Sequence, residues 1–347
     1  MAKTSTTTKK RATKKTSKSP ASRKPAQPKK TVSEETAVVQ TTLSPVPDVQ
    51  TVQKAVQDGK KTDPETALVQ KRRVVNDLFQ RGLAAHQAGQ IDDAIRLYSA
   101  ALRQNQDQPD VWNNLGVALR RSKRFAAALI AYRRAADLRP ENAGLWSNMG
   151  NCLREMMRFD EALAAHKKAI ELDDTIKSHT FNTGLVYRDL NKFSEALGYF
   201  NRALAMDPEY VDANWDSALA HLALGDYAKG WAGYETRRQL ADNPIRPLDS
   251  APEWDGKGDL RGKRLLLRAE QGFGDMIQFA RFIPLVAKRA AHIIVECRKE
   301  LMPIMRTVSG VGAVVEKGRA LPEFDLHVPL LSLPHVLGIG EADLKKI

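Results

Sequence analysis

A fixed spacing of 34 residues constrains this chain more than any other feature. Glycine keeps that spacing at four places, and alanine holds the fifth. The residues of this column are Gly82, Gly116, Gly150, Gly184 and Ala218. A period of this length is typical of repeat proteins, in which each repeat is one supersecondary unit that stacks on the next. The sequence therefore predicts an array of about five similar units rather than an irregular helical bundle.

Further columns keep the same period and suggest how each unit is built. Alanine or glycine stands twelve residues after each anchor, and an aromatic residue or histidine stands sixteen after it. The bulky column is Tyr98, Tyr132, His166, Phe200 and Tyr234. Two packed helices approach closely only where a small residue of one meets a large side chain of the other. The pattern resembles tetratricopeptide repeats over about residues 75–240, which implies helix pairs stacked into a superhelix with a concave inner face.

The charge of the chain is concentrated at its N-terminus. The formal net charge is +13, yet residues 1–30 contain eleven Lys or Arg and no acidic residue, so the rest carries 43 basic and 41 acidic residues. Residues 1–62 have almost no aromatic side chains and are expected to be a disordered basic tail and linker. The tail predicts weak polyanion contact through residues 1–30, and a solubilising role is the alternative.

The remaining composition predicts an intracellular protein without a cofactor. Cys152 and Cys297 form no metal-ligand or disulfide spacing, and each is expected to be a small buried hydrophobe in a reducing, cytoplasmic compartment. No apolar stretch approaches the length of a membrane span, so no membrane contact is expected. Order is expected to begin at Asp63, Pro64 and Glu65, which suit the start of a helix, and the array to extend over residues 63–240.

Polar columns on the first helix of each repeat predict a peptide-binding groove. Asn114, Asn148 and Asn182 stand two residues before their glycines, with Gln80 and Asp216 at the array ends. An amide donates to and accepts from a peptide bond at once, which suits an extended backbone of any sequence. Arg120, Arg154 and Arg188 lie one turn further on and would add affinity for acidic groups. The alternative is that both columns only solvate the inner face.

The chain changes character after the array. Proline and glycine are frequent in residues 241–262, which are expected to form a linker. Residues 263–347 alternate short aliphatic segments with helical patterns, which predicts an α/β unit with a parallel sheet. The expected strands cover residues 264–268, 291–297, 312–315 and 324–328, and the expected helices residues 276–289 and 299–307.

A glycine-bearing turn after the first of these strands is the candidate chemical site. Gly272 and Gly274 would supply two glycines of a dinucleotide-binding fingerprint, and Glu296 could meet a ribose, but Ile277 takes the place of the third glycine. The stretch EQGFGDMIQFARFIP, with RLLLR before it, instead resembles heptosyltransferase-like glycosyltransferases over about residues 252–347. That resemblance implies that Asp275 is the general base for an acceptor hydroxyl. A helix N-cap is the alternative role for Asp275.

The same resemblance implies that the second half of the transferase domain is missing from this chain. Such enzymes have two Rossmann-like halves, the second of which holds most of the nucleotide sugar, and this chain ends about 85 residues into the first. We therefore expect an incomplete Rossmann-like unit that is inactive alone. Two functions remain: a tetratricopeptide scaffold that binds extended polar or acidic peptides and carries a remnant transferase domain, or a protein-modifying glycosyltransferase whose donor-binding half lies elsewhere.

Overall fold

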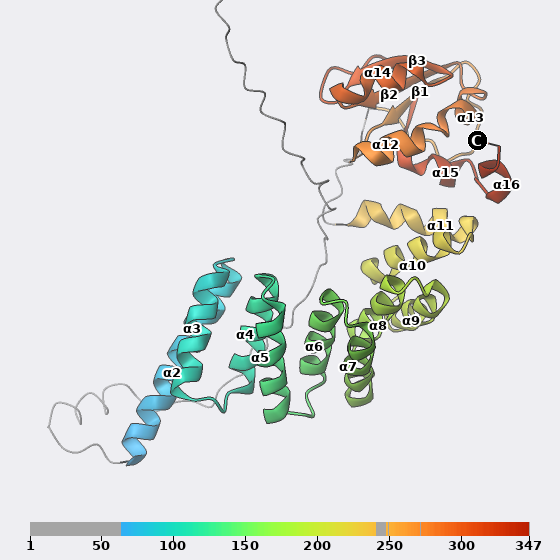
Figure 1. Ribbon diagram of the computed structural model, residues 1–347. Coiled ribbons are helices and arrows are strands. Elements are labelled where there is room, and N and C mark those ends of the chain that lie inside the picture. The colour runs from blue at the N-terminus through green and yellow to red at the C-terminus, as the bar shows by residue number, and fades with distance from the viewer. Residues whose placement is uncertain (1–63, 241–247, 249, 271, 347) are drawn as a thin grey trace, which may run out of the picture. The chain divides into compact units, whose positions relative to one another are not determined.

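The computed structural model describes residues 64–240, 248, 250–270 and 272–346, and the expected N-terminal tail lies outside these residues. From residue 64 onward the chain forms helix pairs that follow one another along the sequence (Figure 1). The first helices of the five pairs are α2 (Pro64–Gln87), α4 (Pro109–Arg121), α6 (Ala143–Glu155), α8 (Lys177–Asp189) and α10 (Val211–Ala223). The second helices are α3 (Ile91–Gln104), α5 (Phe125–Leu138), α7 (Phe159–Leu172), α9 (Phe193–Met206) and α11 (Tyr227–Tyr234), which continues into the 3₁₀ helix η1 (Glu235–Gln239).

The glycine column is the close contact within each pair. A Cβ atom added at Gly116 would lie 2.6 Å from the Tyr132 ring, and one added at Gly150 would lie 2.6 Å from the His166 ring. Tyr132 and His166 are fully buried. Real Cβ atoms do not approach other atoms so closely, so any larger residue would push the two helices apart. The predicted packing of small against bulky columns is confirmed.

The turn inside each pair repeats as well. The residue seven after each anchor has a positive φ, whether or not it is glycine: Gly89 (75°), Lys123 (62°), Met157 (60°), Asn191 (59°) and Gly225 (80°). Left-handed backbone is uncommon for residues with a Cβ. Here the preceding helix fixes it, since the amide of each of these residues bonds to the carbonyl three residues before it. The periodicity of hydrophobic residues gave no sign of this column.

Successive first helices contact one another along the array, α2 with α4, α4 with α6, α6 with α8 and α8 with α10. First helices in mutual contact form the inner layer of a superhelical array, and the second helices form the outer layer. The polar columns of α4, α6 and α8 therefore belong to the inner layer.

The C-terminal part is a small parallel sheet with helices (Figure 1). Its strands are β1 (Arg264–Arg268), β2 (His292–Cys297), β3 (Val311–Glu316) and β4 (Leu326–Pro329), in the order β3-β2-β1-β4. Leu265 pairs with Ile293 of β2 on one side and with Leu326 of β4 on the other. The three central residues of β1 are fully buried, as the run of leucines predicts for a strand covered on both faces.

Two details of this part differ from the sequence prediction. The helix expected over residues 276–289 begins earlier and is divided, into α12 (Phe273–Ala280) and α13 (Ile283–Ala287), with the proline of the second helix at its start. Within the expected linker, Trp254 is buried and its amide donates to the His327 carbonyl at 2.8 Å, while Leu260 is also buried. The chain therefore joins the C-terminal core before β1 begins. The remaining helical segments are η2 (Lys299–Leu301), α14 (Met302–Thr307), η3 (Leu330–Ser332), α15 (Leu333–Val336) and α16 (Glu341–Leu344).

Candidate functional site

The asparagine column bonds within the inner layer. Asn148 Nδ2 donates to Asn113 Oδ1 on the preceding first helix at 3.0 Å, and Asn182 Nδ2 donates to Ser147 Oγ at 3.4 Å. Asn114 is fully buried, and its Nδ2 donates to the Asp110 carbonyl of its own helix at 2.8 Å. Asn148 and Asn182 thus link one first helix to the next, whereas Asn114 bonds within its own helix. Of the two residues expected at the array ends, Gln80 is exposed, whereas Asp216 is buried.

Several buried polar atoms of this layer lack a hydrogen-bond partner among the described residues. They are Asn114 Oδ1 on α4, and Asn151 Oδ1 and Arg154 Nε on α6. Two are acceptors and one is a donor. Buried polar atoms are nearly always paired in native proteins, so each such atom requires an explanation.

The arginine column is paired inside the protein. Arg120 Nη1 lies 2.6 Å from Glu155 Oε1, and Arg154 Nη1 lies 3.0 Å from Asp189 Oδ2. Arg188 contacts Asp189 at 2.9 Å and also Asp216 of α10. Three guanidinium groups therefore face three carboxylates. This differs from the expectation of open cations, and the sequence did carry the signal: Glu155 and Asp189 each stand 35 residues after their arginine.

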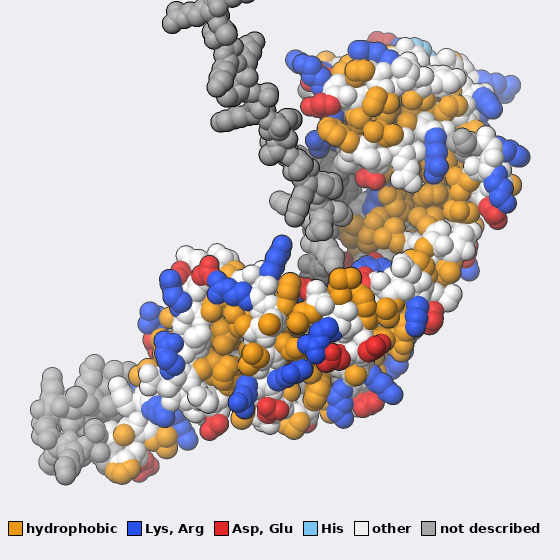
Figure 2. All heavy atoms as spheres, viewed as in Figure 1, with side chains coloured by type: hydrophobic (Ala, Val, Ile, Leu, Met, Phe, Trp, Pro, Cys, Tyr) orange, Lys and Arg blue, Asp and Glu red, His pale blue; other side chains and the backbone are white. Residues whose placement is uncertain are grey.

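Burial and the neighbouring guanidinium groups act in opposite directions on the pKa values of these carboxylates. At Asp216 burial prevails over Arg188 and raises the pKa. Burial works to raise the pKa of Asp189, but the guanidinium groups of Arg154 and Arg188 outweigh it and hold that pKa below its usual value. Asp189 is consequently ionised at neutral pH. Figure 2 shows acidic and basic side chains intermixed over the face in view, in keeping with the nearly balanced charge of the sequence after residue 30.

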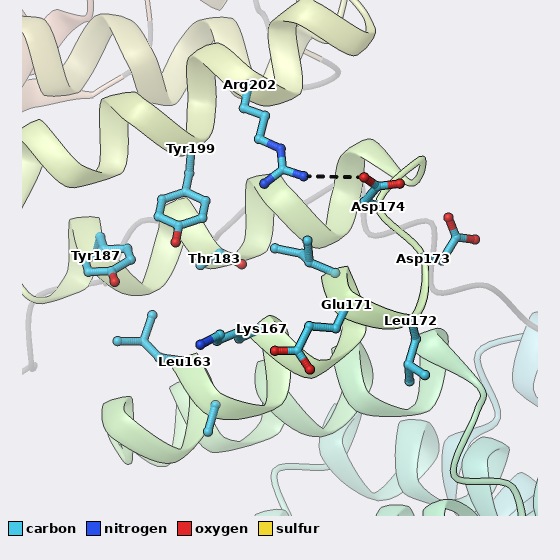
Figure 3. Close-up of a pocket in the computed structure, with 12 residues that line it drawn as sticks. Leu163, Lys167, Glu171, Leu172, Asp173, Asp174, Thr183, Tyr187, Tyr199 and Arg202 are labelled. Atoms are coloured by element: carbon cyan, nitrogen blue, oxygen red, sulfur yellow. Dashed lines mark ion pairs between the residues drawn. The ribbon is translucent and has the colours of Figure 1, made fainter.

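A separate pocket of about 770 Å³ lies among α7, α8 and α9 (Figure 3). Tyr187 and Tyr199 stack at one end with ring centroids 5.3 Å apart, and Arg202 reaches toward Asp174 with an N–O separation of 4.0 Å. Lys167 and Glu171 of α7 lie between these ends. Sequence reasoning missed this pocket. The signal available was that Tyr187 and Tyr199 replace the Leu and Ala that hold the same places in the two preceding repeats.

Asp275 lies in the first turn of α12, directly after β1. The N-cap of that helix is Gly272, so Asp275 is not the N-cap that we considered. Gly272 has a φ of 82°, and a Cβ atom there would lie 2.6 Å from Asp275 Oδ2. Asp275 is exposed, yet partial desolvation by its neighbours raises the pKa of its carboxyl. Glycine at 272 therefore serves both the backbone turn and the placement of this carboxylate.

The last repeat is joined to the sheet by a buried ionic cluster. Arg237 of η1 forms a two-point contact with Glu270, with Nε to Oε2 at 2.8 Å and Nη2 to Oε1 at 2.7 Å. Its remaining donors reach Ser332 Oγ at 2.7 Å, Glu235 Oε1 at 2.6 Å and the Tyr234 carbonyl at 3.2 Å. We call Arg237, Glu270, Glu235 and Ser332 the junction cluster.

Aromatic packing surrounds the junction cluster. The Trp231 ring of α11 lies edge-on to Phe279 of α12 at 5.9 Å, and Tyr234 stacks on the same phenylalanine at 5.9 Å. Trp231 belongs to the hydrophobic core of the sheet rather than to the cores of the repeats. Helix α11 is thus shared between the two parts of the chain.

The described residues contain no group of three or more His, Cys, Asp or Glu placed to hold a metal ion. None of the helices described is long and apolar enough to cross a membrane. The predicted polyanion-binding segment, residues 1–30, lies outside the described part of the chain.

The comparisons with known proteins agree with the helical array. Two models of the tetratricopeptide repeat family match, over residues 79–143 and 141–209. Residues 79–209 therefore consist of tetratricopeptide repeats, and a small parallel sheet follows the helical array in the chain.

Among curated proteins, Protein FlbA of Caulobacter vibrioides is 45% identical over 65 residues, which are 18% of this chain and only 11% of that protein. Among solved structures, the MamA protein has a TM-score of 0.43 at 18% identity, covering 50% of this chain and 98% of its own. PilF of Pseudomonas aeruginosa has a TM-score of 0.45 at 22% identity, covering 49% and 78%. A tetratricopeptide protein of Thermus thermophilus has a TM-score of 0.42 at 19% identity, covering 48% and 91%.

Proposed function

We propose that the repeat array binds an extended polypeptide segment along its inner layer, which makes the chain a protein-binding scaffold. The observation that supports this best is that the amides of Asn148 and Asn182 are half-buried on the inner layer, and each donates one N–H to the preceding first helix. A peptide backbone offers both N–H and C=O groups and could bond to these accessible amides, whatever its side chains.

The bond to the preceding first helix also prepares Asn148 and Asn182 for a ligand. Such a bond fixes the orientation of the carboxamide, and each oxygen can then accept from a ligand without reorganisation of the side chain. A ladder of pre-oriented amides favours a ligand in extended conformation, because successive backbone groups of a strand recur at a regular rise.

The test begins with a random twelve-residue phage library panned on the full chain. For a selected peptide, replacement of Asn114, Asn148 and Asn182 together by Ala is expected to weaken binding by at least tenfold. Each lost hydrogen bond is worth about 0.5–1.5 kcal/mol. Fluorescence anisotropy measures the affinity, and far-UV circular dichroism checks that the helices persist. A triple variant that folds and binds as the parent does would contradict the proposal.

A matched experiment separates backbone from side-chain recognition. Methylation of one backbone nitrogen of the peptide removes one N–H and leaves every side chain in place. The methylated position that faces the half-buried Asn148 should cost binding in the parent and nothing further in the Asn148→Ala variant. Equal losses in both proteins at every position would show that Asn148 accepts no backbone N–H.

A second candidate concerns the sheet. Asp275 stands after β1, beside the place where the strand order reverses between β1 and β4, and open α/β sheets bind ligands at such a place. Its raised pKa suits a general base. The alternative function is accordingly a glycosyltransferase-like unit that uses a nucleotide sugar. The donor-binding half of such an enzyme would lie outside this chain. Release of nucleotide from a nucleotide sugar by this chain, abolished in Asp275→Asn, would favour this alternative, and release that persists in Asp275→Asn would contradict the role of Asp275.

A further inference from the structure

The ionic pairs of the inner layer carry information about the ligand that the amide column does not. Arg120 and Arg154 are each 4% exposed, whereas their partners Glu155 and Asp189 are 27% and 25% exposed. At these two pairs a ligand meets the carboxylate before the guanidinium group. At the third pair the order is reversed, because Arg188 is 26% exposed and Asp216 is 9% exposed.

The charges also balance along the layer. Asp189 bonds to Arg154 from α6 and to Arg188 of its own helix, and Arg188 continues to Asp216 of α10. With the pair of Arg120 and Glu155, the row contains three positive and three negative groups. A ligand with one sign of charge would gain attraction from one member of a pair and repulsion from the other. It would also lose its own hydration on binding.

The accessible amides beside these pairs suit neutral groups. Asn148 and Asn182 are half-buried, and each donates one amide N–H to the preceding first helix. An amide is uncharged, and it bonds to amides and hydroxyl groups without an ionic partner.

We infer that the inner layer selects an uncharged extended segment, rich in Ser, Thr, Asn, Gln or Gly, and rejects acidic ones. This inference rests on the proposed function, because it specifies the ligand of the same surface. It replaces the acidic ligand that the arginine column alone suggested. The paired carboxylates remove that attraction.

The test uses three phage libraries of twelve-residue peptides that differ only in composition: uncharged polar, enriched in Asp and Glu, or enriched in Lys and Arg. The full chain should retain binders from the uncharged library. Their affinity should change by less than about twofold between 50 and 500 mM NaCl, since ionic contacts are screened by salt and amide contacts are not. Acidic binders with steep salt dependence that are weakened when Asn148 and Asn182 are replaced by Ala, or binders from the basic library alone, would overturn the inference and leave the proposed function standing. Acidic binders that this variant retains are bound outside the inner layer and do not count against the inference. No binder from any library would overturn both.

Two conservative variants test whether the paired carboxylates cause the rejection of acidic peptides. Glu155→Gln and Asp189→Asn keep the size of each side chain and one acceptor oxygen for the arginine, but remove the negative charge. Each should capture acidic peptides more strongly than the parent, on the order of tenfold. Glu195→Gln, at an exposed position of the outer-layer helix α9, removes the same charge and should leave selection unaltered. Unchanged rejection of acidic peptides by both folded variants would contradict the electrostatic explanation.

Discussion

Two arginines of this chain are similarly buried but differ in how many hydrogen bonds they donate. Arg154 in the array donates to Asp189 alone among the bonds described, and its Nε has no partner among the described residues. Arg237 at the junction donates through Nε, Nη1 and Nη2 to Glu270, Glu235, Ser332 and the Tyr234 carbonyl. The pKa of Arg237 is raised, because its carboxylate partners outweigh the burial that would lower it.

The two arginines differ in how many of their N–H donors are bonded within the protein. A guanidinium has five N–H donors, and the junction uses them all on side chains and one carbonyl from three segments. In the array, Arg154 Nε and the amide oxygens of Asn114 and Asn151 have no partner among the described residues. We therefore assign the junction cluster to stability, since it fastens the last repeat to the segment that follows β1. Ligand binding by the inner layer remains our proposal.

Removal of Arg237 should have the largest effect. Arg237→Met leaves Glu270 buried and unpaired, and breaking a buried pair in this way costs about 3–5 kcal/mol. Hydrogen exchange should show faster opening of β1, β4 and α12. The double variant Arg237→Met with Glu270→Leu removes both charges and should recover part of the loss. If the double variant were less stable than Arg237→Met, the unpaired charge of Glu270 would not be the cause of the lost stability.

The sequence predicted the array far better than the junction. The columns at Gly116 and Tyr132 are local and repeated, so each copy supports the others, and the resulting helix pairs are confirmed. Arg237, Glu270 and Ser332 are separated by 33 and 62 residues and occur once. No period marks them. Only the fold brings the end of the array and the ends of two strands together.

The candidate site was predictable in part for the same reason. The amide column was visible as a period, but its use in bonds between first helices was not. The arginine column suggested acidic ligands because the carboxylates Glu155 and Asp189 lie in a different column, 35 residues after Arg120 and Arg154, and were not paired with them. The role of Asp275 remains a prediction. It concerns a reaction, and the geometry of one carboxylate does not define a reaction.

Arg154→Met should cost less than Arg237→Met, and so sharpen the comparison. Asp189 keeps Arg188 as a partner at 2.9 Å, so the variant does not leave an isolated buried charge. The loss is that of one hydrogen bond between charged groups, about 1.5–3 kcal/mol, reduced by release of the unpaired Nε. Urea denaturation followed by circular dichroism at 222 nm measures it. A loss as large as that of Arg237→Met would mean that the array pair is equally essential to the fold.

Acid should weaken the array through a histidine that has no counterpart at the junction. His166 is fully buried, and neither ring nitrogen has a partner among the described residues. Burial, with Arg154 and His179 nearby, lowers its pKa to about 3. The unfolded chain takes up this proton near pH 6.5 and the folded chain does not. Stability is therefore complete above pH 6.5 and falls by about 1.4 kcal/mol per unit from there toward pH 3.

The variant His166→Phe isolates this effect, because Phe200 fills the same place in the next repeat. His86 and His179 remain in both proteins, so their own titration cancels in the difference. At pH 5 the variant should be about 2 kcal/mol more stable relative to the parent than it is at pH 7. Hydrogen exchange of α6 and α7 at the two pH values measures this change. Parallel pH profiles would show that the buried imidazole does not limit the array.

The smallest effect should come from a pair with nearly the same geometry as the junction contact and little burial. Arg238 Nη1 and Nη2 lie 2.8 Å from Glu253 Oε1 and Oε2, yet the side chains are 36% and 33% exposed. Water solvates both charges when the contact opens, so Arg238→Met should cost about 1 kcal/mol or less. Thermal melting at low and high salt is the measurement, and the parent should lose part of its advantage at high salt. A cost near that of Arg237→Met would mean that two-point geometry, and not burial, gives the junction its strength.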